Sequence, residues 1–258
     1  MRKVKKVLEK VYENKELRKT IVPLFIGDPG NGKSAIIHQF AKEKKVKIVE
    51  LITSQMSPFE VSGIAIPDKD LKQMVYYNFD KLDSLKDGDI LFFDELLNGN
   101  PVVLNACLTV LEHRTMISGK KLPDVMIVAA ANPQGMTPLT PQIKERFVWY
   151  NVKFDKQYWI DYMIKKYSIT KSIGGKLSSL IAGEGFKGNN FNTPRSIDKA
   201  VNMILHDVPT PYDKIRSILE ELVVNELDEE VKLSDSKTLL PREAIKWIDL
   251  IKYKRGLL

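Results

Sequence analysis

The chain has 258 residues, of which 43% are hydrophobic and 28% charged, with a formal net charge of +7. This composition is typical of one large folded domain, or of a large and a small one. The apolar runs are too short to cross a bilayer and no signal-peptide core follows the basic amino terminus, so we expect no membrane association. With only one cysteine, Cys107, no intrachain disulfide can form, and a cytoplasmic location is expected.

The first twenty residues are strongly basic. Within them Val4, Val7, Leu8 and Val11 recur at helical spacing, which predicts a basic helix over residues 1–20. Such a helix can contact nucleic acid, or it can present an ordinary solvated face while its apolar side packs inward. Charge alone is weak evidence for nucleic-acid binding, so we favour the solvated face.

Apolar runs rich in β-branched residues then alternate with helical patterns up to about residue 155. We expect strands at Ile21–Ile26, Val46–Ile52, Ile90–Phe93, Val125–Ala131 and Val148–Val152. Helices are expected at Ser34–Lys45 and Pro101–Glu112, and a hairpin at Ile64–Tyr77. Unbroken apolar strands that alternate with helices predict an α/β fold with a parallel sheet and helices on both faces.

Beyond residue 155 the pattern is helical only. The segments with helical spacing are Tyr158–Tyr167, Ser196–Leu205, Tyr212–Val224 and Arg242–Ile251. Breakers are expected between them at Gly174-Gly175, at Gly183-Glu184-Gly185 and at Pro209 with Pro211. We therefore predict two domains, an α/β domain over residues 1–155 and a small all-helical domain over 156–258.

A glycine-rich motif follows the first predicted strand. Its residues are Gly27, Asp28, Pro29, Gly30, Asn31, Gly32, Lys33 and Ser34, and they match G-x-x-x-x-G-K-[ST] at every position. Between a strand and a helix, this P-loop motif wraps backbone N–H groups around phosphate. We expect Lys33 to reach the β- and γ-phosphates and the Ser34 hydroxyl to bind Mg²⁺. The sequence thus predicts a P-loop NTPase that binds ATP with Mg²⁺.

Two acidic residues end the strand at Ile90–Phe93. Ligands of parallel sheets lie at the carboxyl ends of the strands, so Asp94 and Glu95 should emerge beside the P-loop. Asp94 is suited to hold Mg²⁺, and Glu95 to polarise an attacking water. A protein that only binds nucleotide would not need this second carboxylate, although a nucleotide-gated binding module without turnover remains an alternative.

From about residue 20 to residue 205 the chain resembles an AAA+ ATPase of the MoxR-like, dynein-related branch. The resemblance rests on the stretch Asp94–Ala106, on Leu122-Pro123 before the fourth strand and on Asn132-Pro133 after it. It implies that Asn132 is a first sensor of the γ-phosphate and that Arg146 is an arginine finger for the neighbouring subunit. It also implies that Arg195 is a second sensor on an AAA+ lid domain. The plain alternative is a turn former for Asn132, a surface charge for Arg146 and an ordinary helix residue for Arg195.

The chain departs from that branch at two positions. Where relatives carry Asn-Arg shortly after the acidic pair, this sequence has Leu97 and Asn98.

Thr53 or Ser54, at the end of the second strand, is a candidate to restrain Glu95 until the right partner binds.

The resemblance implies a ring, a hexamer in particular, that couples ATP hydrolysis to remodelling of a macromolecule, as MoxR-like chaperones do. It also implies a partner with a von Willebrand factor A domain. The hairpins at Ile64–Tyr77 and Arg114–Leu122 would then face the ring axis and touch the substrate. The alternative is a nucleic-acid motor or loader that uses the basic arm over residues 1–20.

Overall fold

The computed structural model describes residues 1–77, 80–116, 118–134, 141–181, 193–206, 208–209 and 214–219. The chain divides into two compact units, Met1–Phe154 and Asp155–Leu258. The expected helix at Arg242–Ile251, most of the one at Tyr212–Val224 and the breaker at Gly183-Glu184-Gly185 lie outside the described residues. Within the described part, no helix is both long and apolar enough to cross a bilayer.

The first unit is built on a five-stranded parallel sheet, as the sequence predicted. Its strands are β1 (Pro23–Ile26), β2 (Ile48–Ile52), β5 (Ile90–Asp94), β6 (Met126–Ala131) and β7 (Val148–Asn151), in the order β2-β5-β6-β1-β7. The central strands are the most apolar ones, and all six residues of β6 are buried. Burial on both faces explains why these strands read as unbroken apolar runs.

The longer helices described in this unit are α1 (Arg2–Glu13), α2 (Lys15–Thr20), α3 (Lys33–Lys44) and α6 (Pro101–His113). The short α-helices are α4 (Phe59–Ser62), α5 (Asp80–Asp83) and α7 (Pro141–Glu145), and the short 3-10 helices are η1 (Thr53–Gln55) and η2 (Leu96–Asn98). Cys107 of α6 is fully buried, and burial raises the pKa of its thiol to about 12. The cysteine is therefore a core residue without thiolate character at neutral pH.

The expectation of one basic helix over residues 1–20 was wrong. The helix ends at Glu13 because Asn14 has extended backbone angles, and the Asn14 side chain accepts hydrogen bonds from the N–H groups of Glu16 and Leu17. Asn14 thereby caps the start of α2. Val4, Leu8 and Val11 are buried, as expected for a helix packed on the domain.

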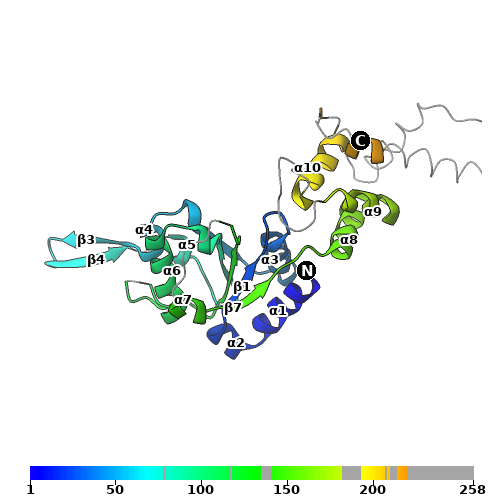
Figure 1. Ribbon diagram of the computed structural model, residues 1–258. Coiled ribbons are helices and arrows are strands. Elements are labelled where there is room, and N and C mark those ends of the chain that lie inside the picture. The colour runs from blue at the N-terminus through cyan, green and yellow to red at the C-terminus, as the bar shows by residue number, and fades with distance from the viewer. Residues whose placement is uncertain are drawn as a thin grey trace, which may run out of the picture. The chain divides into compact units, whose positions relative to one another are not determined.

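The predicted hairpin is present. Strands β3 (Ile64–Asp68) and β4 (Gln73–Tyr77) pair antiparallel, and Figure 1 shows them extending outward from the rest of the first unit. Asp68 organises the turn, because its carboxylate accepts hydrogen bonds from the N–H groups of Asp70 and Leu71. A second, shorter hairpin is marked by an antiparallel bridge between Thr115 and Lys121.

The described part of the second unit contains α8 (Lys156–Tyr167), α9 (Lys171–Ser179) and α10 (Pro194–Leu205). Here the expected break at Gly174-Gly175 was wrong, since both glycines lie inside α9. Tertiary packing explains Gly174, because a Cβ there would come within 2.9 Å of Ile160 Cγ2 in α8, whereas a Cβ on Gly175 would meet nothing within 4 Å. The glycine permits close approach of two helices rather than ending one.

Candidate functional site

The P-loop connects the end of β1 to the start of α3, and its glycines are required by its geometry. Gly30 and Gly32 have φ angles of 82° and 83°, a region that residues with a Cβ seldom adopt. A Cβ on Gly27 would lie 2.2 Å from the carbonyl oxygen of Val152. The loop therefore lies against the chain that follows β7. Helix α3 begins within the motif, at Lys33, and the N–H groups of its first turn are free of helical partners and suited to bind phosphate.

Lys33 holds the centre of this site. Its side chain is only 6% exposed, and its ammonium donates hydrogen bonds to Gly27 O at 2.6 Å, to Asp28 O at 3.0 Å and to Asn132 Oδ1 at 2.9 Å. Asn132 directly follows β6, so this bond joins the P-loop to the end of a neighbouring strand. A buried cation held by oxygens of this kind can exchange them for phosphate oxygens.

Ser34 and Asp94 form the second link across the strand ends. Ser34 Oγ donates a hydrogen bond of 2.7 Å to Asp94 Oδ2, although 60 residues separate the two in sequence. Hydroxyl and carboxylate oxygens are the ligands that Mg²⁺ takes in proteins, together with water and substrate phosphates. The predicted convergence of Asp94 with the P-loop is therefore present in the fold.

Glu95 occupies a constrained turn beside this pair. Its φ angle is 54°, and its carbonyl oxygen accepts a hydrogen bond of 2.8 Å from Thr53 Oγ1. The Ser54 hydroxyl donates to Glu95 Oε2. Both residues that the sequence nominated thus contact Glu95, Thr53 through the main chain and Ser54 through the carboxylate.

Asn98 is a residue of this site whose role the sequence did not indicate. Its Oδ1 accepts a hydrogen bond of 3.1 Å from the N–H of Asn132, and its Nδ2 donates to Gln134 O at 2.7 Å. The sequence showed only that position 98 departs from the pattern of the branch. No local signal pairs position 98 with position 132, because the pairing depends on β5 and β6 being neighbours in the sheet.

The two candidate arginines lie in different units of the chain. Arg146 follows α7 and forms an ion pair of 2.6 Å with Glu112 of α6. Arg195 is exposed on the first turn of α10 in the second unit, where Thr193 and Ser196 form a capping box. The roles predicted for both arginines stay predictions.

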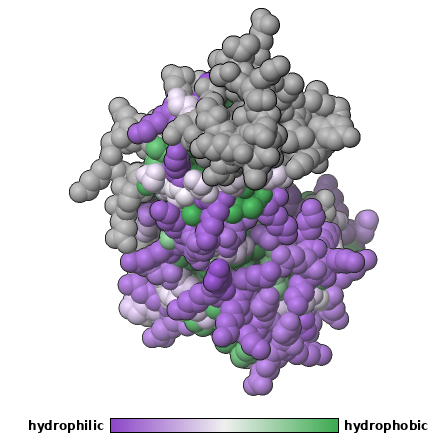
Figure 2. Space-filling model, turned by 90° about the vertical axis from the view of Figure 1, so that its right-hand side faces the viewer, coloured by the Kyte–Doolittle hydropathy of each residue, from purple (hydrophilic) through white to green (hydrophobic). Residues whose placement is uncertain are grey.

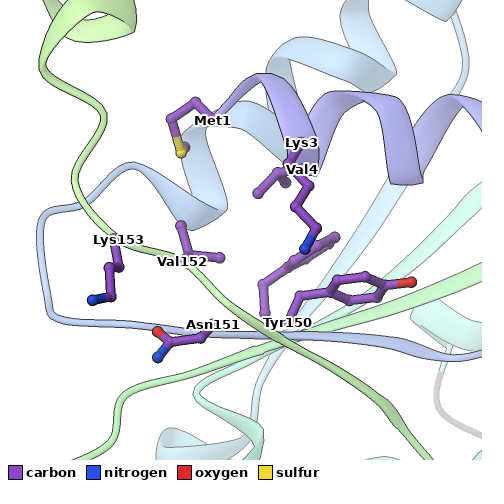
Figure 3. Close-up of a pocket in the computed structure, with 8 residues that line it drawn as sticks. Met1, Lys3, Val4, Tyr150, Asn151, Val152 and Lys153 are labelled. Carbon is purple, nitrogen blue, oxygen red and sulfur yellow. The ribbon is translucent and has the colours of Figure 1, made fainter.

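A small hollow lies beside the P-loop (Figure 3). It is lined by Met1, Lys3, Val4, Phe25, Tyr150, Asn151, Val152 and Lys153. Its volume of about 60 Å³ holds only a few water molecules. The hollow is too small for a nucleotide, so the candidate site is the P-loop with the strand ends rather than this hollow.

The site can be compared with known proteins. The family model described as the MoxR domain in the MoxR-vWA-beta-propeller ternary systems matches residues 19–151. A mutant of RuvB from Thermotoga maritima has 18% sequence identity and a TM-score of 0.56, over 86% of this chain and 70% of RuvB. The Thermotoga maritima structure described as the RuvB Holliday junction branch migration motor also has 18% identity, with a TM-score of 0.54 over 86% of this chain and 69% of that one.

At such low identity the RuvB structures show a shared fold and nothing finer. The fold predicted from the sequence is thereby confirmed. The family match is more specific, because residues 19–151 amount to more than half of the chain and include the P-loop, the Asp94-Glu95 pair, Asn132 and Arg146. The chain belongs to the MoxR family of AAA+ ATPases.

Proposed function

We propose that this protein binds ATP with Mg²⁺ and hydrolyses the ATP. The observation that carries the proposal is the meeting of three strand ends at Lys33, which contacts Asn132, and at Ser34, which contacts Asp94. The residues fit the ligand. The P-loop offers a buried cation and glycines whose conformations admit no other residue without strain, and the hydroxyl-carboxylate pair offers oxygen ligands for a divalent cation.

Each residue then has a role. Lys33 exchanges its bonds to loop carbonyls and Asn132 for bonds to the β- and γ-phosphates. Ser34 and Asp94 hold Mg²⁺, which supplies charge neutralisation at the phosphates when it is bound. Glu95 accepts a proton from the attacking water, and Asn132 orients that water or the γ-phosphate.

We further propose that the active form is a hexameric ring, with Arg146 acting on the site of the neighbouring subunit. In the single chain Arg146 is neutralised by Glu112, and the pair lies at the surface, where such ion pairs contribute only about 0–1 kcal/mol. A neighbour's γ-phosphate would compete readily for this arginine. The unit Asp155–Leu258 would serve as the lid, with Arg195 as its nucleotide sensor.

The target of the ring is proposed to be a protein, remodelled in the manner of a chaperone. The outward hairpin exposes large apolar side chains, among them Ile66, Met74, Tyr76 and Tyr77, and its only charged residues lie at the turn. Such a surface suits an apolar polypeptide better than a phosphate backbone. The description of the matching family also supports a partner with a von Willebrand factor A domain.

The nucleic-acid alternative has less support in the structure. Of the basic residues before position 20, Lys5 pairs with Glu43 and Arg18 pairs with Asp124. The coloured atoms in Figure 2 are mostly hydrophilic, which fits a solvated surface and a nucleic-acid surface equally. Salt-sensitive binding of DNA or RNA that is lost on deleting residues 1–20 would reverse this preference.

The decisive experiment is steady-state ATP hydrolysis in the presence of Mg²⁺ by the parent protein and by Glu95→Gln. The glutamine variant should bind ATP like the parent and turn it over orders of magnitude more slowly, because an amide cannot accept a proton from water. Turnover at the parent rate would remove Glu95 from the mechanism. If the parent itself shows no hydrolysis under any condition, the protein is a nucleotide-gated binding module.

A further inference from the structure

We propose that Asn98 is a positioning residue that sets the orientation of Asn132 for recognition of the γ-phosphate. The proposal rests on the proposed ATPase function and adds a residue to it. Asn98 makes a direct link between the turn that carries Glu95 and the segment that carries Asn132.

The link uses both halves of the Asn98 amide. Its Oδ1 accepts from the N–H of Asn132 at 3.1 Å, while its Nδ2 donates to Gln134 O at 2.7 Å and more weakly to Asn132 O at 3.5 Å. Only a side chain with an acceptor and a donor on one planar group satisfies this pattern. An aspartate would lose the donor, and an apolar residue would lose both.

The same residue is fixed to the catalytic turn through its backbone. The N–H of Asn98 donates a hydrogen bond of 2.8 Å to the carbonyl oxygen of Glu95, which closes the η2 turn. The buried side chains of Leu96 and Leu97 anchor that turn in the core. Asn98 therefore extends from a rigid base, and the Asn132 backbone is held relative to the Glu95 backbone.

Asn132 needs such support when nucleotide binds. Before binding, its Oδ1 is held by the Lys33 ammonium at 2.9 Å. Once Lys33 turns to the phosphates, that contact is weakened, and the backbone of Asn132 must keep its side chain in place. A group that stabilises a transition state has to be held in position beforehand, and the bonds from Asn98 provide this hold.

The test compares Asn98→Ala with Asn100→Ala, a matched control two residues away. Asn100 caps α6 by accepting a hydrogen bond of 2.9 Å from the N–H of Val102, and it is exposed. Both variants lose an asparagine from the same stretch of chain. Only Asn98→Ala loses a bond to Asn132.

Dissociation constants for Mg-ATP and Mg-ADP, kcat, KM and the apo Tm would be measured for each variant. Asn98→Ala should weaken ATP binding and lower kcat by about tenfold each, the effect of one hydrogen bond, while ADP binding stays unchanged. Asn98→Gln, which keeps donor and acceptor, should recover part of the loss. Asn100→Ala should lower the Tm and leave the ratio of ATP to ADP affinity as in the parent.

Equal weakening of ATP and ADP binding, or an unchanged affinity ratio and kcat in Asn98→Ala, would overturn the proposal and leave Asn98 as a structural residue. Those results require a parent that binds and hydrolyses ATP, so they leave the proposed function standing. A parent that binds no ATP would instead overturn both.

Discussion

The hydroxyl of Ser54 donates a hydrogen bond to Oε2 of Glu95, the carboxylate proposed to activate water. A carboxylate oxygen that already accepts this bond is a weaker acceptor for a water proton. The bond also fixes the position of that oxygen, because Ser54 lies just after the end of β2. The resting chain thus holds its proposed base in a restrained state, and substitutions at four places in the chain test the proposed function.

Removing the Ser54 hydroxyl should raise the basal rate of ATP hydrolysis. Ser54→Ala frees Glu95 Oε2, so we expect turnover without any partner to rise by about two- to tenfold, in line with about 0.5–1.5 kcal/mol for one solvent-exposed hydrogen bond. Ser57→Ala is the matched control, because its backbone N–H rather than its hydroxyl bonds to Glu60 Oε2. A fall in the rate of Ser54→Ala would mean that the serine orients the base for catalysis rather than restraining it.

Loss of the Lys33 ammonium should abolish useful nucleotide binding. Lys33→Ala removes charge-assisted hydrogen bonds, each contributing about 1.5–3 kcal/mol, so the affinity for Mg-ATP should fall about a hundredfold or more. Calorimetric titration would measure it. Lys42→Ala, on an exposed position of the same helix α3, should bind like the parent. If the parent, Lys33→Ala and Lys42→Ala bind Mg-ATP with equal affinity, the assignment of the nucleotide site is wrong.

The proposed finger should act across a subunit boundary. Arg146→Ala should bind ATP normally yet hydrolyse it about 10³–10⁵ times more slowly, the range found for arginine fingers. Glu112→Gln is the control, since it breaks the ion pair but keeps the arginine. That control should retain turnover.

A mixing experiment locates the action of Arg146. Neither Arg146→Ala nor Lys33→Ala should be active alone, but their mixture should regain activity at sites where an intact P-loop meets an intact finger. Parent turnover should also rise with protein concentration as rings assemble. A monomer with full, concentration-independent turnover would end the ring proposal and leave Arg146 as a surface residue.

The exposed hairpin should engage the remodelled protein. Tyr76 and Tyr77 are 45% and 57% exposed, so replacing both by alanine should change the Tm little and keep basal ATPase within about twofold. With Glu95→Gln also present, the double tyrosine variant in ATP should no longer hold an unfolded polypeptide. The matched control, Lys69→Ala at the charged turn combined with Glu95→Gln, should still hold the polypeptide. A large drop in Tm would show instead that the tyrosines serve packing.

The sequence by itself determined the parts of the site that depend on local chain geometry. The motif from Gly27 to Ser34 predicts its own local structure. It places glycines where the backbone is left-handed, at Gly30 and Gly32, and a lysine where the helix begins. The same holds for Asp94 and Glu95, since an apolar strand followed by acids sends them to the ligand-binding edge of a parallel sheet.

Tertiary structure alone decided several contacts that the sequence did not indicate. The bond between Asn98 and Asn132, the bond between Lys33 and Asn132 and the ion pair between Arg146 and Glu112 each join residues at least 34 positions apart. Such contacts follow from the strand order β2-β5-β6-β1-β7 and from loop geometry, which periodicity does not encode. Gly174 shows the same limit of sequence patterns. A glycine there predicts a break between helices, but the residue lies inside α9, where the lack of a Cβ allows close packing against Ile160.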